Sequence, residues 1–145
     1  MDNSVTLPRT TTLAPSKGLH IGLWVAQGLL SAAFLMAGGM KASAPMEQLA
    51  AQMPWVTGAM GGAVRFIAIV ELLGAVGLIL PAATRILPKL TPVAASGLLT
   101  VMVLASVTHI SRGEFPMIIP NLVLGGLAAF IAWGRFKGAP IAPRG

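Results

Sequence analysis

Four long apolar segments, separated by shorter polar ones, dominate the hydrophobic pattern of this chain. Each has roughly the 17–25 mostly apolar residues that an α-helix needs to cross the hydrocarbon core of a bilayer. The pattern therefore predicts an all-α fold, a polytopic membrane bundle of four helices. The predicted spans are residues 19–40, 61–80, 92–110 and 116–134.

Prolines mark the ends of three of these segments. Proline has a fixed backbone φ and no N–H, so it is tolerated in the first turn of a helix and tends to end one elsewhere. We expect the second span to end at Pro81 and the third to begin at Pro92. Pro116 and Pro120 lie together at the start of the fourth span, which predicts a distorted first turn.

The connection between the first two spans, residues 41–60, has a helical pattern of its own. Apolar residues recur at positions i, i+3, i+4 and i+7, which places them on one side of a helix. Trp55 follows, and tryptophan favours the membrane–water interface. We expect a short helix on the outer face of the bundle, either a simple connector or a lid over a pocket. The apolar positions are Met46, Leu49, Ala50 and Met53.

Composition narrows the class of protein. The chain has 145 residues, of which 55% are hydrophobic and 10% charged, whereas soluble domains carry about 25% charged residues. The net charge is +6, but the basic residues are scattered rather than gathered with stacking aromatics, so nucleic acid is not an expected partner. The absence of cysteine excludes disulfides and thiolate metal sites.

The distribution of lysine and arginine predicts the orientation. Seven basic residues flank the spans on the side of the termini and three on the other side, and the richer side faces the cytoplasm. We expect a disordered cytoplasmic tail (1–18), a membrane domain (19–135) and a short basic cytoplasmic tail (136–145). The seven are Arg9, Lys17, Arg85, Lys89, Arg135, Lys137 and Arg144, and the three are Lys41, Arg65 and Arg112.

One carboxylate, Glu71, lies inside the apolar run RFIAIVELLGAVGLILP (65–81). At about 1.5 Å per residue it is roughly 10 Å from the outer end of its span. Gly74, Ala75 and Leu78 share its side of the helix, and small residues allow close helix packing. Glu71 is therefore expected to point into the bundle, where it needs a polar partner.

Other polar side chains fall at a similar depth in the outer half of the membrane. We expect a cluster in which each member also has a plain structural explanation. Glu71 could pair with Lys41 or Arg65, and these two could instead reach the headgroups. His109 could be solvated, and Asn121 could bond backbone groups freed by Pro120. The cluster comprises Lys41, Arg65, Glu71, His109 and Asn121.

Metal and haem chemistry find little support in the sequence. No cluster of metal-ligating residues has a suitable spacing, and no glycine-rich phosphate loop is present. His20 and His109 are expected at opposite membrane faces, so they cannot both ligate one haem. We interpret Gln27 as a hydrogen-bonding contact between helices.

The chain resembles the DoxX-like family of four-span membrane proteins. The resemblance is carried by FLMAGGMK (34–41), ELLGAVGLILP (71–81) and LTPVAASGLLTVMVLASVTHISRGE (90–114), and covers about residues 19–135. Some relatives look like subunits of thiosulfate–quinone oxidoreductase, and others are linked to a membrane oxidoreductase complex. By this resemblance, the family's polar positions are Lys41, Glu71, His109 and Glu114.

Two functions follow as hypotheses for a multi-pass protein of the bacterial cytoplasmic membrane. The favoured one is a protein without catalytic machinery of its own, which acts as an accessory or assembly subunit of a membrane redox complex. Its expected partners are the lipid bilayer and either another subunit of such a complex or further copies of this chain. The alternative is a subunit that binds quinone or another lipophilic molecule through Glu71 and His109. No cofactor is evident, quinone is possible, and transport is less favoured because no inverted repeat is visible.

Overall fold

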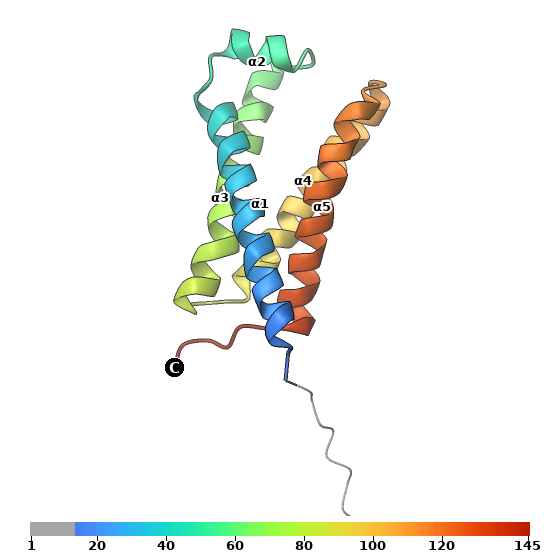
Figure 1. Ribbon diagram of the computed structural model, residues 1–145. Coiled ribbons are helices and arrows are strands. Elements are labelled where there is room, and N and C mark those ends of the chain that lie inside the picture. Colours follow the sequence, from blue (N-terminus) through green and yellow to red (C-terminus); the bar gives the residue numbers. More distant parts are fainter. Residues whose placement is uncertain (1–13) are drawn as a thin grey trace, which may run out of the picture.

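The computed structural model of the protein describes residues 14–145. It is mainly helical and contains no strand in this range, and four of its helical stretches are long and apolar enough to cross a membrane (Figure 1). The predicted all-α, four-span bundle is thereby confirmed. The elements are α1 (Lys17–Ser43), α2 (Met46–Gln52), α3 (Met60–Thr84), α4 (Leu90–Ser111), a 3₁₀ turn η1 (Phe115–Met117), α5 (Ile118–Trp133) and a π-helical turn η2 (Gly134–Gly138).

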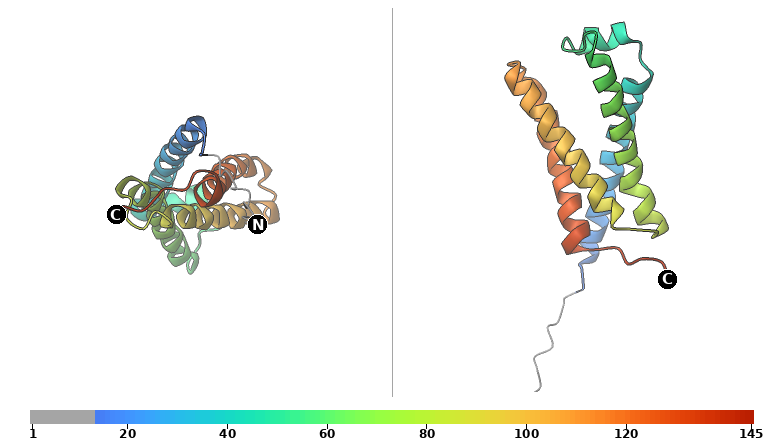
Figure 2. Two further views of the ribbon diagram at one scale, coloured as in Figure 1. Left: turned by 90° about the horizontal axis from the view of Figure 1, so that it is seen from below. Right: turned by 180° about the vertical axis from the view of Figure 1, so that it is seen from behind.

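The long helices form two pairs, α1 with α3 and α4 with α5. The pairs are packed together at the end that carries the C-terminus and the α3–α4 connection, which we call the terminal end. They separate toward the opposite end, the loop end, where α2 covers α1 and α3 (Figures 1 and 2).

The two faces of α3 behave as its sequence predicts. Ala68, Ala75 and Leu78 are fully buried against neighbouring helices. Ile69 and Leu73 are more than half exposed, on a surface that faces acyl chains in a membrane. The opposition of small and large residues thus orients Glu71 toward the interior.

Several helix ends differ from the predicted ones. α1 begins at Lys17, inside the predicted tail, because the Ser16 hydroxyl accepts a hydrogen bond from the Leu19 N–H at 3.2 Å. The prediction that α3 ends at Pro81 is wrong. The helix continues to Thr84, because a membrane helix tolerates the loss of the one backbone donor that proline lacks. Arg85 ends the helix with a positive φ of 59°.

The predicted distortion at the start of the fourth span is confirmed, and the C-terminal end of this span differs from the predicted one. Its 3₁₀ turn η1 contains Pro116 and precedes α5. At the other end η2 carries the chain beyond residue 135, and the Arg144 N–H donates to the Arg85 carbonyl at 2.9 Å. The C-terminal segment is therefore held to the bundle by Ala139, which is fully buried, and by backbone groups of Ala142 and Arg144 that bond Arg85. The part of the predicted N-terminal tail in residues 1–13 lies outside the described residues.

A close approach of α3 to α4 at Gly74 predicts a sharp effect of adding one methyl group. A Cβ on Gly74 would lie 2.6 Å from a methyl carbon of Leu98, which is 1% exposed and belongs to the main hydrophobic core. We expect Gly74→Ala to lower the free energy of unfolding by about 1–3 kcal/mol, by overpacking. Unfolding in mixed micelles of increasing SDS content, followed by circular dichroism, measures this.

Gly97 on α4 is the matched control, since a Cβ there has no neighbour within 4 Å. Gly97→Ala should leave stability unchanged or slightly raised, because alanine narrows the unfolded ensemble. Equal stability of the two variants would show that the helices do not meet at Gly74.

Candidate functional site

A buried ion pair joins α1 to α3 in the half of the bundle nearer the loop end. The Lys41 ammonium donates to both carboxylate oxygens of Glu71, at 2.6 and 2.7 Å. Glu71 is 1% exposed. Such a pair is costly to desolvate, and each member depends on the other for compensation.

Arg65 takes a different partner from the one that sequence reasoning allowed. Its guanidinium donates to the carbonyl oxygens of Lys41 and Ala44, the latter at 2.8 Å. These carbonyls lie at the C-terminal end of α1, where the helix itself supplies no donor. Arg65 therefore caps α1 from α3, and of the two candidate partners it is Lys41 that pairs with Glu71.

The α2 segment is held to this end by a small core of its own. Leu49 is fully buried and packs with Val56 and Val64. Met53 and Trp55 pack beside them and also line the cavity described below. The predicted apolar stripe is confirmed, and the segment forms part of a pocket wall.

A second polar group closes the α4–α5 connection. Gly113 has a φ of 71°, which a side chain would strain, and this turn brings Glu114 back under the end of α4. The Glu114 carboxylate then accepts hydrogen bonds from His109 Nδ1 at 2.7 Å and Arg112 Nε at 2.9 Å. The pKa of Glu114 is lowered, first by the His109 hydrogen bond and then by that from Arg112.

This shift predicts an acid-sensitive contribution to stability. A carboxylate whose pKa is lowered in the folded state stabilises the fold above its ordinary pKa, and the effect is lost as pH falls through the lowered value. The wild type should therefore be more stable than Glu114→Gln at pH 7. The difference should begin to shrink near pH 4.5, the ordinary value, and vanish in stronger acid.

SDS unfolding of both proteins between pH 7 and 3 measures the difference, with Glu47→Gln as the control. Glu47 lies in the first turn of α2, and its exposed side chain makes no hydrogen bond or ion pair within the described residues. A difference between wild type and Glu114→Gln that does not change with pH would contradict the charged contact.

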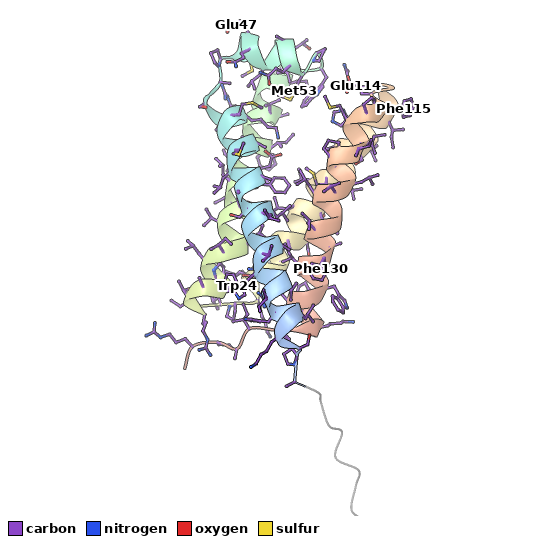
Figure 3. All side chains as sticks on the ribbon, in the orientation of Figure 1. Trp24, Glu47, Met53, Glu114, Phe115 and Phe130 are labelled. Atoms are coloured by element: carbon purple, nitrogen blue, oxygen red, sulfur yellow. The ribbon has the colours of Figure 1, made fainter. Side chains whose placement is uncertain are left out.

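A cavity of about 640 Å³ lies between α3 and α4 toward the loop end. Four predicted site residues contribute to its wall, and its remaining wall is largely apolar. Arg65 and Glu114 do not line it, although each contacts a residue that does. Figure 3 shows Met53 and Glu114 at this end, on the α2 side and the α4–α5 side respectively. The four residues are Lys41, Glu71, His109 and Asn121.

Asn121 does not have the structural role considered for it. Its amide nitrogen is buried and donates to no group in the described part of the chain. This amide nitrogen therefore donates no hydrogen bond to the backbone near Pro120. A buried donor without an acceptor costs free energy, and such a group at a cavity wall is suited to a bound acceptor.

The structure also buries a residue that the sequence alone placed among tail charges. Arg135 is 4% exposed, and its Nε donates to Gln27 Oε1 at 2.6 Å, while the Gln27 amide donates to the Leu78 carbonyl. Gln27 thus bridges helices as predicted. The one sequence feature that could have indicated the burial of Arg135 is the neighbouring Gly134. Because Gly134 has no side chain, Leu23 of α1 packs directly against it.

The two histidines lie at opposite ends, as predicted, with His20 near the start of α1 and His109 near the end of α4. Within residues 14–145 no three histidine, aspartate or glutamate side chains are grouped as they would be around a metal ion.

Comparison with known proteins gives one match. The sequence model of the DoxX-like family matches residues 25–131, which include two of the four apolar helices in full and most of the first and fourth. No curated protein and no solved structure shows significant similarity to the chain.

Proposed function

The chain belongs to the DoxX-like family of membrane proteins, and from this premise we propose that it binds a lipophilic molecule with a hydrogen-bond-accepting head, most simply a quinone, in the cavity between α3 and α4. The observation that carries the proposal is the combination of an apolar wall with a few convergent polar groups. Ligand sites generally have this composition, and volumes of about 300–1,000 Å³ are usual for them.

The donors in the wall suit a carbonyl ligand. The Asn121 amide nitrogen has no partner, and an ammonium has three donors, of which Lys41 gives two to Glu71. A quinone carbonyl offers the acceptor that these groups lack. His109 lines the same cavity and is held through its Nδ1 by Glu114, which leaves its other ring nitrogen for a ligand or a proton.

The route of entry supports a ligand that dissolves in the bilayer. Phe66 on α3 and Leu104 on α4 both line the cavity, and they are 66% and 61% exposed. Their exposed surfaces face acyl chains in a membrane. A molecule of the bilayer interior can therefore enter sideways between the helices without crossing the polar loops.

We further propose that the terminal end faces the cytoplasm of a bacterial cell and the loop end the outside. Among the described residues, six lysines and arginines lie at the terminal end and three at the loop end, and the positive-inside rule then sets the orientation. A quinone bound in the outer half would exchange electrons with a redox group on a partner subunit, which is the accessory role expected from the sequence.

Fluorescence quenching tests the binding. In a Trp24→Phe/Trp133→Phe variant, Trp55 is the remaining tryptophan, and it lines the cavity. Ubiquinone-1 added to this variant in lipid nanodiscs should quench Trp55 emission to saturation. The Trp133-only variant is the control, because Trp133 is exposed on α5 away from the cavity.

Asn121→Leu tests the polar contact. Loss of one hydrogen bond to the quinone should weaken binding several-fold, at about 0.5–1.5 kcal/mol per bond. Quenching that rises without saturation, and equally for Trp55 and Trp133, would show that the quinone only dissolves in the lipid and would refute the proposal.

A further inference from the structure

The terminal end contains a buried cation that the proposed quinone site does not use. Arg135 lies in η2 with its Cζ 5.3 Å from the centre of the Trp24 ring. Its Nη1 donates to the Ala139 carbonyl at 3.1 Å and lies 3.2 Å from His20 Nδ1. Its Nη2 is buried and has no partner in the described residues.

No aspartate or glutamate side chain among residues 14–145 bonds to this cation. Glu47 is in α2, Glu71 is paired with Lys41, and Glu114 is in the α4–α5 connection. Figure 3 shows Glu47 and Glu114 at the loop end and Trp24 toward the terminal end. A buried charge is strongly destabilising unless an opposite charge and hydrogen bonds compensate it. Arg135 has only neutral acceptors.

His20 reveals that donors also outnumber acceptors here. One ring nitrogen faces Arg135 Nη1, and the other faces the indole nitrogen of Trp24, each at 3.2 Å. Guanidinium and indole N–H groups only donate, whereas a neutral imidazole has a single acceptor nitrogen. In either tautomer one pair of N–H groups therefore converges without an acceptor between them.

These donors border a cavity. A space of about 380 Å³ at the terminal end is lined by His20 and Trp24 of α1 and by Arg85 at the end of α3, among others. The Arg85 Nε donates to the Ala142 carbonyl at 3.0 Å, which holds the guanidinium at the cavity wall. The positive φ of Arg85 ends α3 at this point and directs the chain across the bundle.

We propose that this cavity binds an oxyanion of the phosphate type, with Arg85, Trp24 and His20 as its donors and Arg135 supplying positive charge from behind His20. A phosphate oxygen between His20 and Trp24 accepts both converging N–H groups. Arginine pairs well with phosphate because its donors match the spacing of two oxygens. The terminal end lies at headgroup depth, so the phosphate can belong to a phospholipid or be free in solution.

The test uses the full chain in an uncharged detergent, with Trp55→Phe and Trp133→Phe so that Trp24 is the remaining tryptophan. Trp24 emission is followed during titration with inorganic phosphate, with dihexanoyl phosphatidylglycerol and with dihexanoylglycerol, which lacks phosphate. We expect a saturable change with a phosphate-bearing probe and none with dihexanoylglycerol. Saturation by the phospholipid at a concentration at least about tenfold below that of inorganic phosphate identifies a lipid headgroup, and the reverse identifies a free ion.

Two charge variants separate the site from general attraction. Arg85→Gln should weaken the response about tenfold or more, while Lys89→Gln, which removes a charge at the same end but not from the cavity wall, should leave it unchanged. Equal loss in both variants, or no saturable change with any phosphate probe, overturns the proposal. Asp2 lies outside the described residues, so a response that appears only in Asp2→Asn would mean that the chain fills the site itself, and would also overturn it.

Discussion

Lys41→Met is expected to lower the free energy of unfolding by about 3–5 kcal/mol, the usual cost of leaving one member of a buried ion pair alone. The Glu71 side chain is 2% exposed and has both oxygens bonded to Lys41, so without Lys41 its charge has no compensation in the described structure. SDS unfolding of the purified variant, followed by circular dichroism, measures the loss.

The double variant Lys41→Met/Glu71→Leu tests the cause. Replacing both members of a buried pair by apolar residues is often neutral or stabilising, so most of the lost stability should return. Lys17→Met is the control, since Lys17 is exposed at the start of α1 and should change stability by no more than about 0.5 kcal/mol. If the double variant is as unstable as the single one, the lysine stabilises the bundle by packing rather than by charge.

Ala105→Phe is expected to weaken ubiquinone-1 binding at least about tenfold, which corresponds to about 1.4 kcal/mol. Ala105 lies on α4 and lines the cavity between α3 and α4, so a phenyl ring there occupies space that the ligand needs. The measurement is the saturable quenching of Trp55 in the variant that retains this tryptophan alone.

Ala129→Phe is the matched control because Ala129 is exposed on α5 and does not line the cavity. It should bind the quinone as the parent does. Both variants should retain the parent stability, because one fills empty space and the other faces lipid. Unchanged binding in Ala105→Phe would locate the quinone outside this cavity.

The four-span architecture could be predicted because membrane helices have one strong requirement, a long apolar run. The orientation of Glu71 was also predictable, since small residues on its side of α3 contrast with the large exposed ones. The pairing with Lys41 was only one of two options. Arg65 was the other, and the choice depends on where α1 ends, because its free carbonyls attract Arg65.

The terminal-end cluster could not be predicted in the same way. Arg135 follows an apolar span and carries a charge, so its sequence environment is that of an ordinary flanking residue. Its burial depends on the π-helical turn and on Leu23 filling the space beside Gly134, which are contacts between distant parts of the chain. The prediction that α3 ends at Pro81 failed for a related reason. The rule that proline ends a helix comes largely from helices in water, and this helix lies in a membrane.

The hydrogen bonds that join the two helix pairs have an uneven distribution. Within the described chain, side-chain bonds between the α1–α3 pair and the α4–α5 segment with its C-terminal extension all lie at the terminal end, through Gln27, His20, Arg85 and Arg135. The covalent link between the pairs, residues 85–89, is there too. At the loop end, Arg65 and α2 tie α1 to α3 but not to α4.

The two helix pairs are therefore joined at one membrane face, the terminal end, which we call the pivot, and separate toward the other face. α4 has 22 residues, so its free end lies about 33 Å from the pivot. A rotation of a few degrees at the pivot becomes a displacement of an ångström or more at the opening. The lateral pressure of the surrounding acyl chains acts on the outer surface of both helix pairs along their whole length. We therefore expect the distance between α3 and α4 at the loop end to depend on the composition of the bilayer and on substitutions at the terminal end.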